Sequence, residues 1–344
     1  MLVGGAALSQ KFTDLRIAPA YGGLVAYAQD AMSGLALANR ILSGESERAA
    51  LAAAAAARRK SAASPAAEPA ENPLAAPEVR SESVEAAAPV AAPDREEHVL
   101  PNLDLARIWS YLNPHMLFVK HLGLRGSFQR LKEARDPKLA ELEAVIDRVK
   151  AKGWIRARAM YRYFDAWSEG NTLHVSRPGG GAVSFAFPRQ AMGERLCLAD
   201  YVAGKGSGCD SVALLVTTAG EGIRQRAEEL KAAGEYLLCH ALQALAVETA
   251  EAAAEWLHRK IRESWGFPDP PELTMTDRFQ ARYRGKRYSF GYPACPELAD
   301  QTKLFELLPG PKIGVELTDG FMMDPEASVS AIVVHHAQAR YFAA

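Results

Sequence analysis

The sequence predicts an α+β fold, with an antiparallel sheet and flanking helices in its larger C-terminal part and a partial α/β unit before it. The first observation is that short alternating strands, a long helical stretch and further strands follow one another after residue 98, an order typical of α+β domains. The second is that glycine turns separate strand-like from helix-like patterns in residues 1–44. A low-complexity stretch at residues 45–97 separates the two parts. With 344 residues and 37.2 kDa, the chain is long enough for about two domains.

Residues 1–44 resemble the tail of an α/β unit. The run Val3-Gly4-Gly5-Ala6 predicts a strand end that meets a glycine turn, and residues 21–28 predict a second strand. A helix is predicted to begin at Asp30, because aspartate is a good N-cap. One or two such repeats cannot bury both faces of a sheet. We therefore expect either that another chain completes the sheet or, as the favoured alternative, that the sequence is the C-terminal portion of a longer protein.

Residues 45–97 predict a linker. Their first part is alanine-rich and favours a helix, because alanine has the highest helix propensity. Their second part contains prolines at positions 65, 69, 73, 77, 89 and 93, which remove hydrogen-bond donors and stop a helix. Large apolar side chains do not repeat there, so we expect a flexible tether.

Residues 98–344 are long enough to bury a sizeable core. An amphipathic segment at 103–124 is followed by a helix that Asp136 and Pro137 begin and Gly153 ends. Strands are predicted at 155–164, 172–175 and 183–187, with a turn at 178–181, and a buried strand at 211–217. Residues 220–265 are predicted to be helical with an interruption at Gly234, and a later strand covers 330–335.

The composition excludes several classes of function. Lys+Arg total 40 and Asp+Glu 41, and this net charge of −1 argues against nucleic-acid binding and against polybasic membrane attachment. Apolar runs are far shorter than a membrane span, and the first residues lack a basic signal region. The four cysteines are scattered without a CxxC pair, which is typical of a reduced cytoplasmic protein rather than of a zinc site.

The run from Arg287 to Pro296 is the most informative for chemistry. Read as a strand, it places Arg287, Ser289 and Gly291 on one face and aromatic side chains on the other. A guanidinium beside small residues suits a ligand that carries a carboxylate, because the backbone can be approached closely and the ion pair can be bidentate. Residue types alone favour the plainer alternative, a surface arginine on an edge strand.

Other candidates are weaker. Glu251 lies at the edge of a helical apolar stripe, where it could face a cationic ligand, although a solvated helix position is the commoner case. His335 and His336 are adjacent on a predicted strand and so point to opposite faces, which argues against a shared metal ion. Motifs of hydrolases, P-loops and dinucleotide folds do not occur, so we predict no catalytic residues and no metal site.

Several motifs together resemble a known family. They are YSFGYPACP at 288–296, CLADYV at 197–202, EAAAEWLH at 251–258, the stretch 317–330 and HHAQARYF at 335–342. As a set they are similar to the C-terminal activation domain of cobalamin-dependent methionine synthases, and residues 1–44 are similar to the end of the cobalamin-binding domain. The resemblance implies a Rossmann-like tail at 1–44, a linker at 45–97, and a domain with a bent antiparallel sheet that binds S-adenosylmethionine at 98–344.

The resemblance also implies a function. Family members are methyltransferases that move a methyl group from 5-methyltetrahydrofolate to homocysteine through cobalamin. The activation domain binds S-adenosylmethionine and supports reductive methylation of cob(II)alamin back to methylcobalamin, with an electron from flavodoxin or a similar donor. The cobalamin-binding and substrate modules would be the partners. Zinc belongs only to the homocysteine module, which this sequence lacks, so the chain alone is not expected to complete a turnover.

The resemblance further implies site residues. The expected S-adenosylmethionine contacts are Asn113, Glu251, Arg287, Ser289, Gly291, Tyr292, Tyr341 and Phe342. Arg287 would hold the carboxylate, Glu251 would balance the ammonium or sulfonium charge, and the aromatic residues would wall the ligand. Contacts to cobalamin are expected from Gly4, Gly5, Ala6 and Ala31.

Two departures from the family pattern leave an alternative open. Asn113 stands where some members have aspartate, so this contact would bring no charge. The DxHxxG motif, which supplies the axial histidine to cobalamin, is absent. The alternative is a non-catalytic docking module, or a separate reactivation subunit that acts on a cobalamin protein in trans. An independent methyltransferase is disfavoured, because a glycine-rich first loop is absent.

Overall fold

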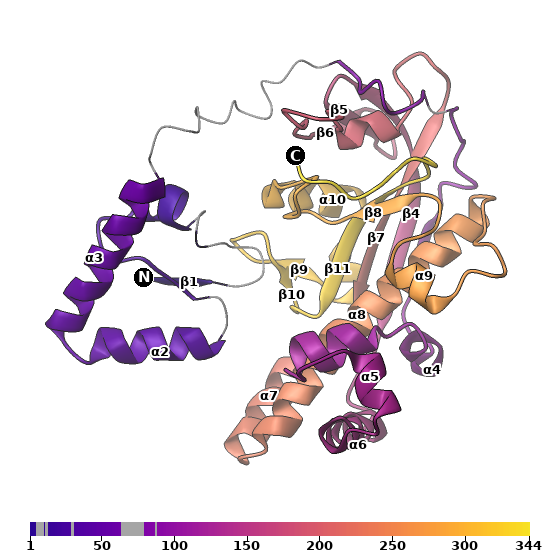
Figure 1. Ribbon diagram of the computed structural model, residues 1–344. Coiled ribbons are helices and arrows are strands. Elements are labelled where there is room, and N and C mark those ends of the chain that lie inside the picture. The colour runs from indigo at the N-terminus through magenta and orange to yellow at the C-terminus, as the bar shows by residue number, and fades with distance from the viewer. Residues whose placement is uncertain (5–9, 11–12, 29–30, 63–78, 87) are drawn as a thin grey trace. The chain divides into compact units, whose positions relative to one another are not determined.

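The computed structural model describes residues 1–4, 10, 13–28, 31–62, 79–86 and 88–344. The chain divides into two compact units, Met1–Asn72 and Pro73–Ala344 (Figure 1). Among the described residues, helices long and apolar enough to cross a membrane are not found.

Among its described residues, the first unit contains a small parallel sheet and two long helices. Strand β1 (Leu2–Gly4) pairs in parallel with β2 (Ala26–Ala28), as an α/β unit requires. The turns η1 (Thr13–Ile17) and η2 (Ala18–Ala20) lie between them in the sequence, and α2 (Ala31–Leu42) follows β2. The alanine-rich stretch forms α3 (Glu45–Ala62). The second strand is shorter than the predicted 21–28. Asp30, the predicted N-cap of the helix that follows, lies outside the described residues.

The second unit is built on a seven-stranded antiparallel sheet, which confirms the predicted α+β class. Its strands follow the order β6-β5-β4-β7-β11-β8, and β3 also pairs with β4. The strands are β3 (Glu97–Leu100), β4 (Arg158–Glu169), β5 (Thr172–Ser176), β6 (Ala182–Ala186), β7 (Asp210–Thr218), β8 (Lys286–Tyr288) and β11 (Ser328–Val334). All nine residues of β7 are buried, because the sheet is covered on both faces.

Helices surround this sheet (Figure 1). They are α4 (Leu105–Trp109), η4 (His115–His121), α5 (Phe128–Glu133), α6 (Pro137–Ala151), α7 (Ile223–Ala232), α8 (Tyr236–Ser264), α9 (Met275–Phe279) and α10 (Gln301–Leu307). Short 3-10 turns are η5 (Leu198–Tyr201), η6 (Leu298–Asp300) and η7 (Gly310–Ile313), and β9 (Glu316–Leu317) pairs with β10 (Met323–Asp324). The helix predicted from Asp136 is confirmed, because the Asp136 carboxylate accepts from the Lys138 and Leu139 amides at 2.9 and 3.0 Å. The predicted interruption at Gly234 is also confirmed, with φ of 78° between α7 and α8.

Two hydrophobic cores lie on opposite faces of the sheet. Alternate β7 residues divide between them: Leu215 packs with α6 and α8, whereas Leu214 and Val216 pack with the segments around residues 185–202 and 304–315. Helix α8 is fixed to the sheet by a polar contact as well, since the Thr217 hydroxyl donates to the Ala250 carbonyl at 3.0 Å. This anchor sets the position of the helical turn that carries Glu251.

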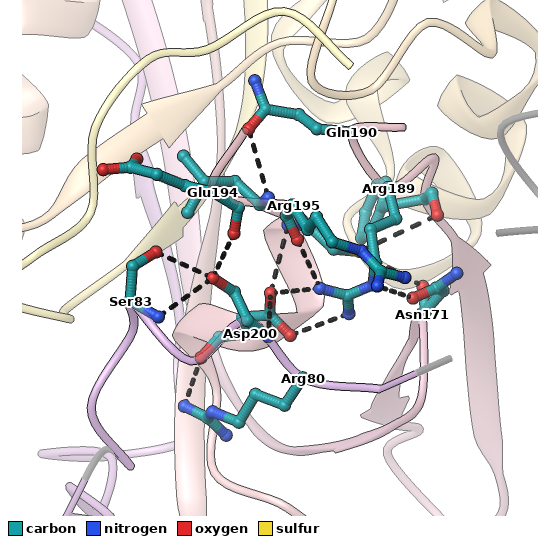
Figure 2. A network of polar contacts seen from close by, with 12 residues as sticks. Arg80, Ser83, Asn171, Arg189, Gln190, Glu194, Arg195 and Asp200 are labelled. Carbon is teal, nitrogen blue, oxygen red and sulfur yellow. Dashed lines mark hydrogen bonds and ion pairs between the residues drawn. The ribbon is translucent and has the colours of Figure 1, made fainter. Parts of the chain in front are cut away.

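A buried ion pair organises the other face of the sheet. Arg189 donates to both Asp200 oxygens, at 2.6 and 2.9 Å, and the two side chains are 0% and 1% exposed. Asn171 accepts from Arg189 Nε at 2.8 Å, and Asp200 also accepts from the Cys197 amide at 3.1 Å (Figure 2). Buried charges need such partners.

Residues 80–86 and 88–90, which we call the docking segment, lie against this ion pair. Arg80 donates to the Asp200 carbonyl, and the Ser81 hydroxyl donates to the Glu194 carbonyl at 2.5 Å (Figure 2). Farther along, the Val90 amide donates to Asp210 at 3.0 Å. The sequence predicted that these residues belong to a linker ending at 97, whereas the structural division falls between Asn72 and Pro73. The difference arises because the segment is fixed by polar contacts and by isolated apolar side chains such as Val84, which give no apolar periodicity.

Candidate functional site

A cavity of about 550 Å³ gathers most of the residues that the sequence singled out. It is lined by Glu251, Arg287, Tyr288, Ser289, Tyr292, Pro293, Ala294, Tyr341, Phe342 and Ala343. Helix α8, the end of β8, the loop that follows β8 and the C-terminal tail each contribute to the wall. Six of the eight predicted ligand contacts are therefore brought together from three distant parts of the sequence.

Arg287 is the cation of this cavity and is held by a buried carboxylate. Its Nη1 donates to Glu255 Oε2 at 2.5 Å and lies 3.4 Å from the Tyr283 hydroxyl, and its Nη2 is 3.8 Å from Glu251 Oε2. Strand β8 is the edge strand of the sheet, as the plainer interpretation had it, but the Arg287 side chain is only 17% exposed. Burial alone would lower the pKa of Arg287, yet Glu255, Tyr283, Tyr341 and Glu251 raise it well above its usual value. Arg287 therefore stays charged and is oriented before any ligand arrives.

The strand predicted for residues 287–296 is wrong beyond Tyr288. Gly291 has φ of 87° and donates its amide to the Cys295 carbonyl at 3.0 Å, so the chain turns there. The turn at Gly291 ends the extended run, and Pro293 and Pro296, which lack an amide donor, prevent a strand from resuming after it. Ser289 lines the cavity, whereas Gly291 is not among its lining residues. A ligand contact from Gly291 stays a prediction.

Asn113 lies outside the lining of the cavity. Its side-chain oxygen accepts from the His115 and Met116 amides at 3.1 and 3.4 Å, at the start of η4. The amide thus satisfies two donors of a helix terminus, which is a structural role that asparagine and aspartate share. Its contact with a ligand stays a prediction.

The predicted cobalamin contacts belong to the first unit. Gly4 ends β1 and Ala31 begins α2, whereas Gly5 and Ala6 lie outside the described residues. These four assignments stay predictions.

Carboxylates on one face of α8 set the charge of the cavity. Glu248, Glu251 and Glu255 recur at helical spacing and so lie on the same side of the helix. Burial, together with Glu248 and Glu255, raises the pKa of Glu251, while Arg287 and His121 oppose the shift. A cation and carboxylates placed this closely suit a zwitterion, which presents one carboxylate and one ammonium.

Aromatic side chains form the exposed rim. Tyr292 and Tyr341 are 63% and 54% exposed, although both line the cavity. Tyr341 packs edge-on against Tyr288 with ring centroids 5.6 Å apart, and Phe342 packs against Tyr201 at 6.3 Å. The rim therefore offers flat apolar surfaces beside a charged interior.

Comparison with known proteins shows the family. The model of the family described as vitamin B12 dependent methionine synthase, activation domain, matches residues 104–344. The chain belongs to this family. It is 33% identical over 380 residues to the methionine synthase of Mycobacterium tuberculosis (strain ATCC 25618 / H37Rv) and 32% identical over 388 residues to that of Mycobacterium leprae (strain TN). These alignments cover 99% of this chain but 32% and 31% of the relatives, so the chain spans about a third of their length.

A solved structure agrees with the fold. The crystal structure of the MetH reactivation domain bound to AdoHcy matches with a TM-score of 0.68 and 25% identity, over 75% of this chain and 83% of that chain. The activation domain of this chain is thus similar in sequence and in fold to the reactivation module of methionine synthases.

Sequence reasoning missed Glu255 and Tyr283. Glu255 is only 7% exposed, accepts from the Tyr283 hydroxyl at 3.2 Å, and has a second oxygen, Oε1, that is buried without a hydrogen-bond partner among the described residues. One signal was available, because Glu255 follows Glu251 by four residues and so shares its helix face. Tyr283 gave no comparable signal.

A second cavity contains none of the predicted residues. It has a volume of about 330 Å³ and lies between the start of α7 and residues 324–327. Its two arginines are already paired, Arg158 with Glu221 at 2.8 Å and Arg224 with Asp324 at 2.7 Å. We therefore place the functional site in the first cavity.

Among the described residues, groups of three or more side chains fit to hold a metal ion are not found. His335 and His336 take separate partners: His335 bonds to the Asp210 carboxylate at 2.6 Å, and His336 to the Glu85 carbonyl at 3.2 Å.

Proposed function

We propose that the cavity binds S-adenosylmethionine and that the chain serves the reactivation of a cobalamin-dependent methionine synthase. The observation that carries this proposal is the Arg287 guanidinium, held by Glu255 at 2.5 Å inside a cavity whose other wall presents Glu251. The similar solved structure is a MetH reactivation domain bound to AdoHcy, which supports the same class of ligand.

The residues fit this ligand in size and in charge. The volume of about 550 Å³ falls in the range of 300–1,000 Å³ usual for small-molecule sites. Arg287 would take the ligand carboxylate through a bidentate pair, and Glu251 would accept from the ammonium or lie near the sulfonium. Tyr292, Tyr341 and Phe342 would cover the remaining apolar and aromatic surface of the ligand.

This assignment explains why a general base is not needed. A reduced cobalamin, where bound, would supply the nucleophile that takes the methyl group, so that the S–CH₃ bond of the sulfonium would break and S-adenosylhomocysteine would leave as a neutral thioether. One electron from a flavodoxin-like donor supplies the reduction. Protons are not transferred, so the contribution of this chain is to bind and orient the sulfonium, and positioning alone lowers a barrier substantially.

The wider roles are proposals of the same kind. We propose that cobalamin-binding and substrate modules act with this chain, that zinc is confined to the homocysteine module, and that the location is cytoplasmic. Four unpaired cysteines are consistent with a reducing compartment.

Calorimetry tests the ligand assignment directly. We would titrate S-adenosylmethionine and S-adenosylhomocysteine into the full chain, into Arg287→Ala, and into Arg130→Ala, which changes an exposed arginine on α5 as the matched control. Loss of a charged hydrogen-bond pair of about 1.5–3 kcal/mol predicts a Kd about 10- to 100-fold weaker for Arg287→Ala alone. Equal binding by all three proteins would contradict the role of Arg287.

The same titration separates the alternative function. The alternative of a docking module is motivated by Asn113, because an amide brings no charge to a ligand where some family members have aspartate. If the wild-type chain binds neither S-adenosylmethionine nor S-adenosylhomocysteine but forms a complex with a cobalamin protein, the result would support docking over ligand binding.

A further inference from the structure

Two walls of the cavity belong to a tail without regular structure. Residues 335–344, all of them described, lie outside helices and strands, and they carry Tyr341 and Phe342. A helix or strand fixes its side chains through its own hydrogen-bond ladder, but this tail has no ladder. The positions of both aromatic walls therefore depend on what the tail contacts.

The docking segment supplies one set of these contacts. The Glu85 amide donates to Gln338 Oε1 at 2.9 Å, and His336 Nε2 donates to the Glu85 carbonyl at 3.2 Å. His336 Nδ1 accepts from the backbone N–H of Gln338 at 3.1 Å, so the ring is neutral with its proton on Nε2. Burial lowers the pKa of His336, which favours this neutral form. Backbone groups of Glu85 are thus clamped between two tail side chains.

The docking segment is itself anchored at points away from the tail. Arg80 and Ser81 bond to the Asp200 and Glu194 carbonyls (Figure 2). The Val90 amide bonds to Asp210. Glu194 also forms an ion pair with Arg340 of the tail. Two routes therefore connect the docking segment to the tail, one direct through Glu85 and one through the loop around Glu194.

We propose that the docking segment positions the C-terminal wall of the ligand cavity, and that ligand binding and docking of this segment are thermodynamically coupled. The ten residues that line the cavity include no residue of the docking segment, and neither His336 nor Gln338 of the tail. Arg80, His336 and Gln338 therefore act on a ligand by positioning the tail and not by touching the ligand. Coupling is reciprocal: whatever stabilises the docked segment tightens the ligand, and the ligand stabilises the docked segment. This inference rests on the proposed ligand class.

The position of the docking segment in the sequence connects ligand affinity to the first unit. It begins eight residues after the division between the two units at Asn72 and Pro73. A force that the first unit exerts along the chain would therefore act on the docking segment before it acts on the rest of the activation domain. Ligand affinity can therefore respond to where the first unit is held.

Side-chain variants of the full chain test the proposal. Gln338→Met keeps the length of the side chain but removes the acceptor for the Glu85 amide, whereas Gln338→Glu keeps an acceptor. Arg80→Met removes the donor to the Asp200 and Glu85 carbonyls and so weakens the docking segment. Gln129→Met, on the exposed face of α5, is the control. Because Gln338 is exposed, we expect Kd for S-adenosylhomocysteine to weaken about two- to fivefold in Gln338→Met and in Arg80→Met. Gln338→Glu and the control should bind as wild type does.

Hydrogen exchange gives a second readout that a merely structural role would not move. Saturating S-adenosylhomocysteine should slow exchange of the Glu85 and Val90 amides, although neither residue lines the cavity. Without ligand, Gln338→Met should speed exchange of the tail amides at 339–343 and leave β7 unchanged. Unchanged affinity in both Met variants, or unchanged exchange at Glu85 and Val90 on binding, would overturn the coupling.

The two proposals fail in different ways. If the wild-type chain binds neither nucleoside, the proposed ligand is wrong and the ligand-free exchange of the tail still decides whether the docking segment holds it. If the wild-type chain binds and the Met variants bind equally well, the positioning role is wrong and the ligand assignment stands.

Discussion

Replacing Arg287 should separate what this residue does for stability from what it does for binding. The Arg287→Met variant removes the cation from Glu255, which is 7% exposed and 2.5 Å from the guanidinium. Removing one partner of a fully buried ion pair costs about 3–5 kcal/mol. Here the Arg287 side chain is 17% exposed and the Tyr283 hydroxyl still bonds to Glu255. We therefore expect the free energy of unfolding to fall by about 2–3 kcal/mol.

A second substitution tells us where that cost comes from. If it arises from the uncompensated Glu255 carboxylate, Arg287→Met/Glu255→Gln should recover at least half of the lost stability, because the buried charge is gone. Ligand affinity should stay at least about tenfold weaker in both variants, since the cation for the ligand carboxylate is missing from each.

Urea unfolding followed by tryptophan fluorescence is a suitable assay. All five tryptophans lie between residues 109 and 265, so the signal reports the second unit alone. Calorimetry supplies the ligand affinities in parallel. The reasoning is refuted if Arg287→Met unfolds at the same urea concentration as wild type, or if Glu255→Gln deepens the loss.

Three further predictions concern other parts of the second unit. Because the pKa of Glu251 is raised, S-adenosylmethionine should bind the wild type more tightly as the pH rises through that pKa, and binding should release a proton. Glu251→Gln should abolish this pH dependence. Calorimetry in buffers of different ionisation enthalpy counts the protons released. Gly285→Ala should lower the free energy of unfolding by more than about 1 kcal/mol in urea titrations, because φ is 73° and the new Cβ would lie 2.6 Å from the Val334 carbonyl oxygen. Arg189→Met should cost about 3–5 kcal/mol by the same measurement, since it leaves Asp200 buried without its cation; a loss under 1 kcal/mol would contradict this account of the ion pair.

Local signals in the sequence were enough to predict several of the regular elements. The cap at Asp136 and the break at Gly234 act within one helical turn, so their residue types alone determine the outcome. The nearly continuous apolar run of β7 likewise follows from burial on both faces. The family resemblance then identified most of the cavity, because its motifs mark the segments that meet there.

Long-range contacts were beyond this reasoning. Glu255 and Tyr283 meet Arg287 from 32 and 4 residues away, and both the register of β8 against β11 and the packing of α8 on the sheet bring the three together. The Gly291 turn was misread because alternating small and aromatic residues mimic a strand. The docking segment was missed because backbone groups such as those of Glu85, together with isolated side chains such as Arg80 and Val84, carry its contacts, and these form no periodic pattern in the sequence.

The sheet order has a consequence for how the protein is made. Strand β8 pairs with β11 alone in the sheet, and β11 also supplies the second neighbour of β7. During synthesis, β8, which carries Arg287, therefore leaves the ribosome before its pairing partner has been made, because β11 ends at Val334, more than 40 residues after Tyr288. Contacts so distant in sequence form slowly. The ligand pocket therefore cannot be completed until β11 and the C-terminal tail have been synthesised.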